Sequence, residues 1–110
     1  MAVNRHRGEV PAIIDGRERT LCLTLGALAE LEDAFAADSL AGLAERFGTG
    51  RLSARDLTRI LAAGLRGGGA DVSEAEMAVM RIDGGAAGAA TVAAQLLAAA
   101  FGTPGEQPEP

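Results

Sequence analysis

Three serines are the residues whose type and position in this sequence suggest chemistry. Ser39, Ser53 and Ser73 each precede a segment with helical periodicity. A serine hydroxyl at the start of a helix accepts a hydrogen bond from a backbone N–H of the first turn, which stabilises the helix by about 1 kcal/mol. The Ser53–Asp56 and Ser73–Glu76 spacings also match a capping box, in which the acid reaches back to the serine N–H. Capping therefore gives each of these serines a structural role.

Ser39 also has an interpretation as a covalent attachment site. The stretch Asp38-Ser39-Leu40, followed by a short amphipathic helix, resembles the prosthetic-group serine of acyl carrier proteins. The resemblance ends upstream of Ser39, where carrier domains have a long helix and a long loop and this chain has a predicted hairpin and one short helix. We expect Ser39 to be a helix cap. An acyl carrier-like protein with a prosthetic group on Ser39 is kept as an alternative.

Other catalytic arrangements find little support in the residues. His6 is the only histidine and lies in the N-terminal segment, so a Ser-His-acid arrangement would depend on a flexible arm. The carboxylates Glu30, Glu32 and Asp33 are expected on a solvated helix face rather than as an acid/base pair. The run 66–69 (RGGG) lacks the Gly-Lys-Ser/Thr ending of a phosphate loop and predicts the end of a helix. We therefore expect no catalytic residue, no cofactor, no metal and no enzymatic activity.

Composition and charge exclude several other classes of protein. The 110 residues carry a net charge of −5, all ten basic residues are arginines, and the only aromatic residues are three phenylalanines. An acidic chain with scattered arginines and few aromatic rings is a poor nucleic-acid binder. Cys22 is the only cysteine, so no disulfide can form within the chain. The longest apolar run, residues 86–101, is mostly alanine and too short to span a bilayer, so we expect a cytoplasmic protein without a membrane partner.

Residues 8–24 are predicted to form a β-hairpin. Asp15-Gly16 is a strong signal for a type I′ turn, which needs positive φ at both central positions. Pairing outward from this turn sets Ile14 opposite Arg17, and the apolar side chains then share one face: Val10, Ala12, Ile14, Leu21 and Leu23. Pro11 cannot donate to a strand ladder, so the first strand is expected at an edge. Two strands alone are marginal, so the following helices must cover the apolar face.

After residue 24 the apolar period changes from two to about 3.6 residues. This period predicts helices at residues 25–36, 39–47, 53–66, 74–81 and 86–101. The expected fold class is α+β, mainly α, with the hairpin packed on a bundle of four to five short helices. Residues 8–101 are expected to form a single domain, residues 1–7 a flexible N-terminus, and residues 102–110 a disordered acidic tail rich in Pro and Gly.

Two helix features could contact a partner, but for both we expect packing within the chain. Met77 and Met80 lie on one side of the fourth helix, as core-filling methionines do. The last helix carries small residues at four-residue spacing, which would let another backbone approach it closely: Ala86, Ala90, Ala94 and Ala98. Such an edge usually packs inside its own chain.

A family resemblance covers nearly the whole chain. It lies in "RGEV" (7–10), "IDGRER" (14–19), "LTLGALAELEDAF" (23–35), the stretch 39–69, and an Ala-rich last helix that ends in Phe-Gly. These segments resemble the small tail proteins of gene transfer agents and related tailed phages. The resemblance runs from Arg7 to Gly102.

This resemblance implies a role in tail assembly. Small helical proteins of this kind act as tail assembly chaperones, which associate with a tape measure protein and help tail tube subunits polymerise around it in the bacterial host cell. Related proteins are also labelled tail tube proteins, so a structural tube subunit of a virion-like particle is a second alternative. A tube subunit normally needs a larger β-sandwich, and we therefore favour the chaperone. An apolar groove or helix face is expected to bind helical segments of the tape measure protein, and self-association stays open.

Overall fold

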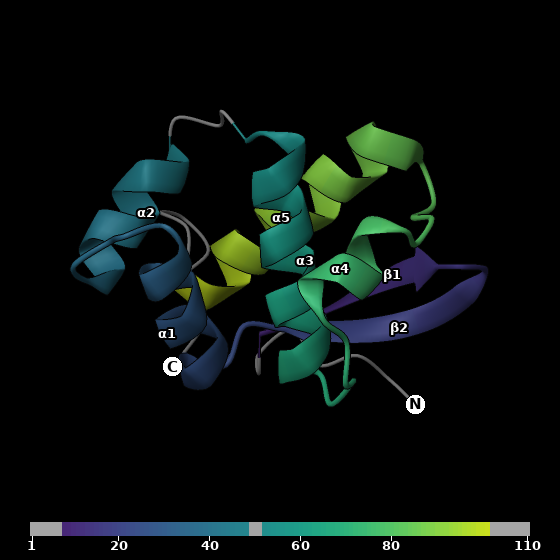
Figure 1. Cartoon of the computed structure of the whole chain (residues 1–110), viewed down its shortest axis with the longest axis horizontal. Helices are drawn as coiled ribbons and strands as arrows, with labels where there is room; N and C mark the ends of the chain where they lie inside the picture. The colour runs from purple at the N-terminus through teal and green to yellow at the C-terminus, as the bar shows by residue number, and fades with distance from the viewer. Residues whose placement is uncertain (1–7, 49–51, 102–110) are drawn as a thin grey trace, which may run out of the picture.

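The computed structural model describes residues 8–48 and 52–101. Its elements in chain order are β1 (Glu9–Ile14), β2 (Arg17–Cys22), α1 (Leu25–Ala34), α2 (Leu40–Gly48), α3 (Ala54–Gly67), α4 (Glu74–Ala78) and α5 (Gly85–Phe101). The predicted class, α+β and mainly α with an N-terminal hairpin, is confirmed (Figure 1). The predicted flexible segment 1–7 and the predicted tail 102–110 lie outside the described residues.

The helices are arranged around α3. In Figure 1 the hairpin runs along one side of the molecule, and α1 and α2 lie together at the opposite end. Helix α3 contacts β2, α1, α4 and α5, while α5 contacts both strands. The apolar face of the hairpin is thus covered by α3 and α5, as a two-stranded sheet requires.

The hairpin has the predicted turn and register. Asp15 and Gly16 have φ values of 52° and 76°, as a type I′ turn needs. Ile14 is opposite Arg17 and Val10 is opposite Leu21. All five residues predicted for the apolar face are buried: Val10, Ala12, Ile14, Leu21 and Leu23.

Pro11 lies in β1 without disturbing its pairing with β2. In a two-residue hairpin the pair that flanks the turn is hydrogen-bonded and pairs then alternate, so Pro11 and its partner Thr20 form a non-hydrogen-bonded pair. The N–H that proline lacks would therefore have pointed to the outer edge of β1. Nearer the turn this edge is paired, because Ile82 bridges Ile14 and the Asp83 N–H donates to the Ile13 carbonyl at 2.9 Å.

Helices α1 and α2 are joined through their aromatic residues. The Thr24 hydroxyl caps α1 by accepting from the Ala27 N–H at 3.1 Å. Phe35, at the end of α1, meets Phe47 of α2 edge to face, with ring centroids 5.0 Å apart. Such pairs contribute about 0.5–1.5 kcal/mol beyond the burial of their area.

Helix α3 ends against the edge of β2 at two glycines. A Cβ atom on Gly67 would lie 1.9 Å from the Cys22 carbonyl oxygen, and one on Gly68 would lie 2.0 Å from the Thr20 carbonyl oxygen. The predicted helix end in the glycine run is confirmed, since α3 ends at Gly67 with Gly68 as its C-cap. The glycines also allow a close approach of two backbones that the sequence analysis did not foresee.

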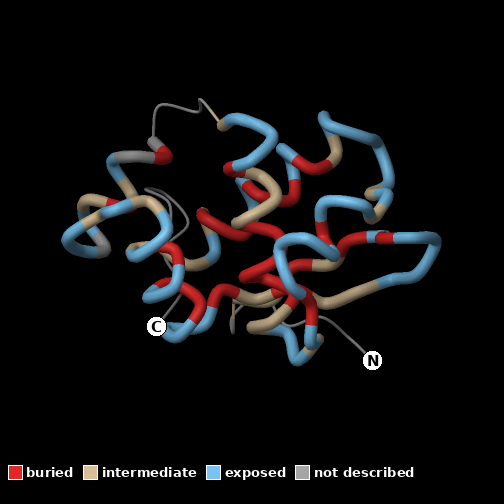
Figure 2. The backbone as a smooth tube through the Cα atoms, viewed as in Figure 1, coloured by how far each residue is buried: buried red, intermediate tan, exposed pale blue. Residues whose placement is uncertain are grey.

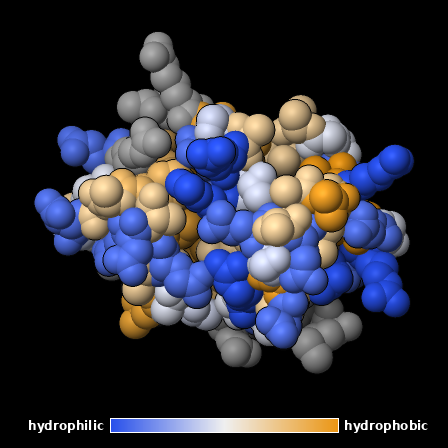
Figure 3. Space-filling view, viewed as in Figure 1, coloured by the Kyte–Doolittle hydropathy of each residue, from blue (hydrophilic) through white to orange (hydrophobic). Residues whose placement is uncertain are grey.

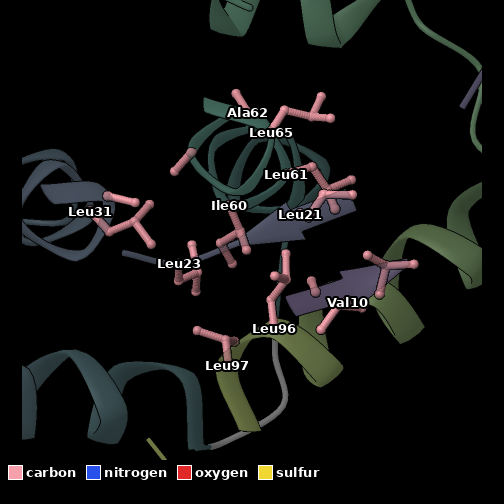
Figure 4. Packing of buried hydrophobic residues seen from close by; sticks show 14 of the residues in the cluster. Val10, Leu21, Leu23, Leu31, Ile60, Leu61, Ala62, Leu65, Leu96 and Leu97 are labelled. Atoms are coloured by element: carbon pink, nitrogen blue, oxygen red, sulfur yellow. The ribbon is translucent and has the colours of Figure 1, made fainter. Parts of the chain in front are cut away.

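The core lies where α3, α5 and the hairpin meet. Figure 4 shows side chains from these elements and from α1 gathered around α3: Val10, Leu21, Leu23, Leu31, Ile60, Leu61, Ala62, Leu65, Leu96 and Leu97. Figure 2 shows the same distribution as buried segments along the middle of the molecule, with the hairpin tip and the outer helix faces exposed.

Helix α4 is shorter than predicted. It ends at Ala78 rather than near residue 81, and Val79 is its C-cap. The chain leaves the helix because residues 81–83 align with β1: the Asp15 N–H donates to the Arg81 carbonyl at 2.7 Å, and the Arg81 N–H donates to the Asp15 carboxylate at 2.9 Å. A tertiary contact with the hairpin turn therefore overrides the helical period.

Candidate functional site

The structure places Ser39 at the start of α2 as a cap. Its hydroxyl accepts a hydrogen bond from the Gly42 N–H at 3.1 Å, and the residue is exposed. This contact accounts for a serine at this position without a covalent group.

The other two serines form the predicted capping boxes. The Ser53 hydroxyl accepts from the Asp56 N–H at 3.1 Å, and the Ser53 N–H donates to the Asp56 carboxylate at 3.0 Å. Ser73 and Glu76 are joined in the same way at 3.1 and 2.9 Å. Hydrogen bonds from the Ser73 backbone and side chain lower the pKa of Glu76 below its ordinary value of 4.5.

Among the acidic residues of α1, Glu30 forms an ion pair with Arg66. Glu30 is bound by the Arg66 guanidinium, whose Nε lies 3.2 Å from the Glu30 carboxylate and whose second nitrogen donates to the same oxygen. Arg66 also donates to the Val72 carbonyl at 2.8 Å, so it ties α1 to the chain after α3. Within residues 8–48 and 52–101 no three His, Cys, Asp or Glu side chains converge to hold a metal ion, and His6 lies outside these ranges.

The surface feature that stands out is an apolar groove between α3, α4 and the start of α5. It has a volume of about 440 Å³. One stripe of α3 forms its first wall, the N-terminal end of α5 its second, and α4 with the chain after it its third. The lining residues are Ala54, Leu57, Thr58, Leu61, Met77, Ala78, Met80, Arg81, Ile82, Gly85, Ala86 and Ala89.

Local sequence explains why this groove forms. Ala54, Leu57, Thr58 and Leu61 are spaced at i, i+3, i+4 and i+7, so they share one face of α3. Glycine and alanine at the start of α5 leave little side-chain volume to fill the gap between the two helices. The result is a shallow apolar surface that no segment among the described residues covers. In Figure 3 apolar side chains gather over α4 and the N-terminal end of α5, beside hydrophilic residues.

Met77 and Met80 have two roles here. Met77 is buried, with 5 % of its surface exposed, and Met80 packs partly buried against the core. The predicted core packing is thus found, but both side chains also line the groove. Val79, between them, is 82 % exposed. Methionine is flexible and adapts to different surfaces, so these residues suit a wall that contacts a partner.

Arg59 links α3 to its neighbouring helices. Its Nε lies 3.6 Å from the Glu74 carboxylate, and its guanidinium lies 5.6 Å from the centre of the Phe35 ring. The same side chain donates to the Ala34 carbonyl at 3.4 Å. Arg59 therefore connects α3 to the end of α1 and to α4, a cluster that the sequence analysis missed because its members are far apart in the chain.

The outer face of α5 is exposed and uncharged. Ala86, Ala90 and Ala94 are exposed and Ala98 is half-buried, so the prediction that this edge packs within the chain is wrong. The reason is the helical period: the larger residues Val92, Leu96 and Leu97 face the core and turn the alanine edge outward. Among the described residues, none of the helices combines the length and the apolar character needed to cross a membrane.

Comparison with known protein families identifies a match over nearly the whole chain. A family model described as "Phage tail tube protein, GTA-gp10" matches residues 7–103. This span contains the hairpin, the five described helices and the groove. Neither a curated protein nor a solved structure matches the chain.

Proposed function

This chain belongs to the tail protein family of gene transfer agents and tailed phages, and we propose that it acts as a non-enzymatic tail assembly chaperone. In this role it binds the tape measure protein and promotes assembly of the tail tube, in the cytoplasm of a bacterium that carries a gene transfer agent or prophage. The observation that carries the proposal is an apolar groove that the described residues leave uncovered, within a chain of this family.

The groove and the outer face of α5 supply a surface of the kind that a chaperone needs. Tape measure proteins contain long amphipathic helices, which aggregate when their apolar faces are left exposed. A groove between helices is a common binding site for such helices, which insert apolar residues spaced at i, i+3, i+4 and i+7. Binding would keep a tape measure protein soluble until tube subunits surround it.

A tail tube subunit is the second candidate function, favoured by the words "tail tube protein" in the description of the family. The described residues contain one two-stranded sheet, order β1-β2, in a mainly helical domain. Closing a ring by strand pairing normally takes a larger sheet, which is why we place the chaperone first. Self-association is compatible with either function.

Co-expression with the tape measure protein of the same gene cluster tests the proposal. We expect the tape measure protein to stay soluble, and to be retained on an affinity tag of this chain, only when the two are produced together. A chain that leaves the tape measure protein insoluble, yet forms rings or tubes by itself in electron micrographs, would contradict the chaperone function and support the tube subunit.

A further inference from the structure

The groove continues along α3 and α4. A second depression of about 380 Å³ is lined by Ala54, Arg55, Thr58, Glu74, Ala75 and Ala78. It shares Ala54, Thr58 and Ala78 with the first, so the two form one continuous groove. From Ala54 to Leu61 the groove follows about 10 Å of α3, which is the length of about two turns of a helix lying beside it.

Apart from its charged residues, the lining is poorly suited to orient a small polar ligand. Pockets for such ligands place a few polar groups toward the bound molecule. Here the Thr58 hydroxyl already donates to the Ala54 carbonyl at 2.9 Å within its own helix. The walls instead carry small residues, which allow the backbone of another helix to approach: Ala54, Ala78, Ala86 and Ala89.

The lining of the groove carries two arginines and one glutamate although the whole chain has a net charge of −5, and the Asp15 carboxylate accepts from the Arg81 backbone N–H beside it. Arg55 and Arg81 line the two parts of the groove, and within the described residues neither has a carboxylate at ion-pair distance. Glu74 is the only acidic residue in the lining, and it is paired with Arg59. An occupant that complements these charges carries carboxylates toward Arg55 and Arg81.

We propose that the groove binds one amphipathic helix of the partner protein, with apolar residues inserted between α3 and α5 and acidic residues facing Arg55 and Arg81. This inference rests on the proposed function and specifies the partner segment as an acidic amphipathic helix. A second copy of this chain fits less well. Its exposed helix face, on α5, has no charged residue from Gly85 to Phe101, and in its acidic helix α1 the apolar face formed by Ala27, Leu28 and Leu31 is buried in its own core.

Binding measurements on purified variants test the inference. Binding is first measured as formation of a soluble complex with the tape measure protein of the same gene cluster. Affinities are then measured with fragments of that protein. We expect Arg55→Glu and Arg81→Glu each to weaken binding about tenfold or more, and the affinity of the unmodified chain to fall as salt rises. Arg17→Glu makes the same charge change at the exposed hairpin tip and is expected to change binding less than about twofold.

A second pair of variants tests the shape of the groove. Ala86 and Ala90 are exposed on the same helix, one turn apart, but only Ala86 lines the groove. Ala86→Gln is expected to block the site and weaken binding about tenfold, while Ala90→Gln leaves it nearly unchanged. Circular dichroism before binding verifies that both variants are folded.

The outcomes separate this inference from the proposed function. If the unmodified chain does not bind the tape measure protein, the proposed function fails and the inference fails with it. If binding is intact and none of the groove variants weakens it, the inference alone is overturned. It is also overturned if Ala86→Gln abolishes a dimer seen by sedimentation, because the occupant is then a second copy.

Discussion

Replacement of Gly67 by alanine tests how closely α3 approaches β2. The added Cβ would lie 1.9 Å from the Cys22 carbonyl oxygen, 3.0 Å from its carbon and 3.4 Å from the Thr24 nitrogen. Carbon–oxygen contacts between neighbouring segments are normally about 3.3 Å or longer. These are backbone atoms and cannot rotate away as a side chain would, so the end of α3 or the edge of β2 must move by about 1 Å or more.

The size of the effect follows from two opposing terms. Forcing extra atoms into a packed region destabilises a protein by about 1–3 kcal/mol. Alanine in place of a helical glycine stabilises it by at most about 0.5–1 kcal/mol, and less at the last residue of a helix. We expect a net loss of about 1–2 kcal/mol in the free energy of unfolding, which lowers the melting temperature by about 4–16 °C for a domain of this size.

Thermal unfolding followed by circular dichroism measures this loss, with Gly26→Ala as the matched control. Gly26 is exposed near the start of α1, and the nearest atom to an added Cβ is the Thr24 hydroxyl oxygen at 3.8 Å. That variant is expected to unfold at the same temperature as the original chain or slightly above it. If Gly67→Ala unfolds together with Gly26→Ala, the close contact between α3 and β2 does not exist as described.

Further predictions concern the caps, the core and the strand edge. An NMR titration should give a pKa for Glu76 below 4.5, and Ser73→Ala should raise that pKa. Because the pKa is lower in the folded chain, the hydrogen bonds from Ser73 to the Glu76 carboxylate stabilise the fold above pH 4.5. This stabilisation is lost as the pH falls through the folded-state pKa. Ser39→Ala should lower the free energy of unfolding by about 1 kcal/mol and Ser39→Asp by less, in denaturant titrations. The original chain should gain no mass on incubation with coenzyme A and a phosphopantetheinyl transferase; a gain that Ser39→Asp abolishes would support the carrier alternative. Leu21→Ala should cost about 2–5 kcal/mol in the same titrations, since Leu21 is fully buried. Pro11→Thr should leave stability within about 0.5 kcal/mol but increase self-association in sedimentation experiments, because it restores an N–H donor on the outer edge of β1.

Local signals predicted much of the fold because they act between residues close in the chain. Asp15-Gly16 specified the turn, and alternation from that turn specified the register and the buried face of the hairpin. The serines marked the starts of α2, α3 and α4 because a cap involves residues only three positions apart. The end of α4 was predicted wrongly because the competing contact, from Arg81 to Asp15, joins residues 66 positions apart.

The candidate site could not be located from the sequence. Its walls come from α3, α4 and α5, and no local sequence pattern determines the angles at which these helices cross. The alanine edge of α5 illustrates the difficulty, since small residues are equally common on faces that pack and on faces that stay exposed. Only the position of Val92, Leu96 and Leu97 against the core decided that this edge faces outward.

The sequence by itself determined the hairpin, the helix starts and the resemblance to gene transfer agent tail proteins. Each of these depends on neighbouring residues or on whole-chain composition. The tertiary structure alone decided that Gly67 and Gly68 bring α3 against β2 and that residues 81–83 extend the edge of the hairpin. It also decided that residues 8–48 and 52–101 leave an apolar groove with Arg55 and Arg81 uncovered. These features depend on how distant segments pack together, and packing is a property of the folded chain rather than of any stretch within it.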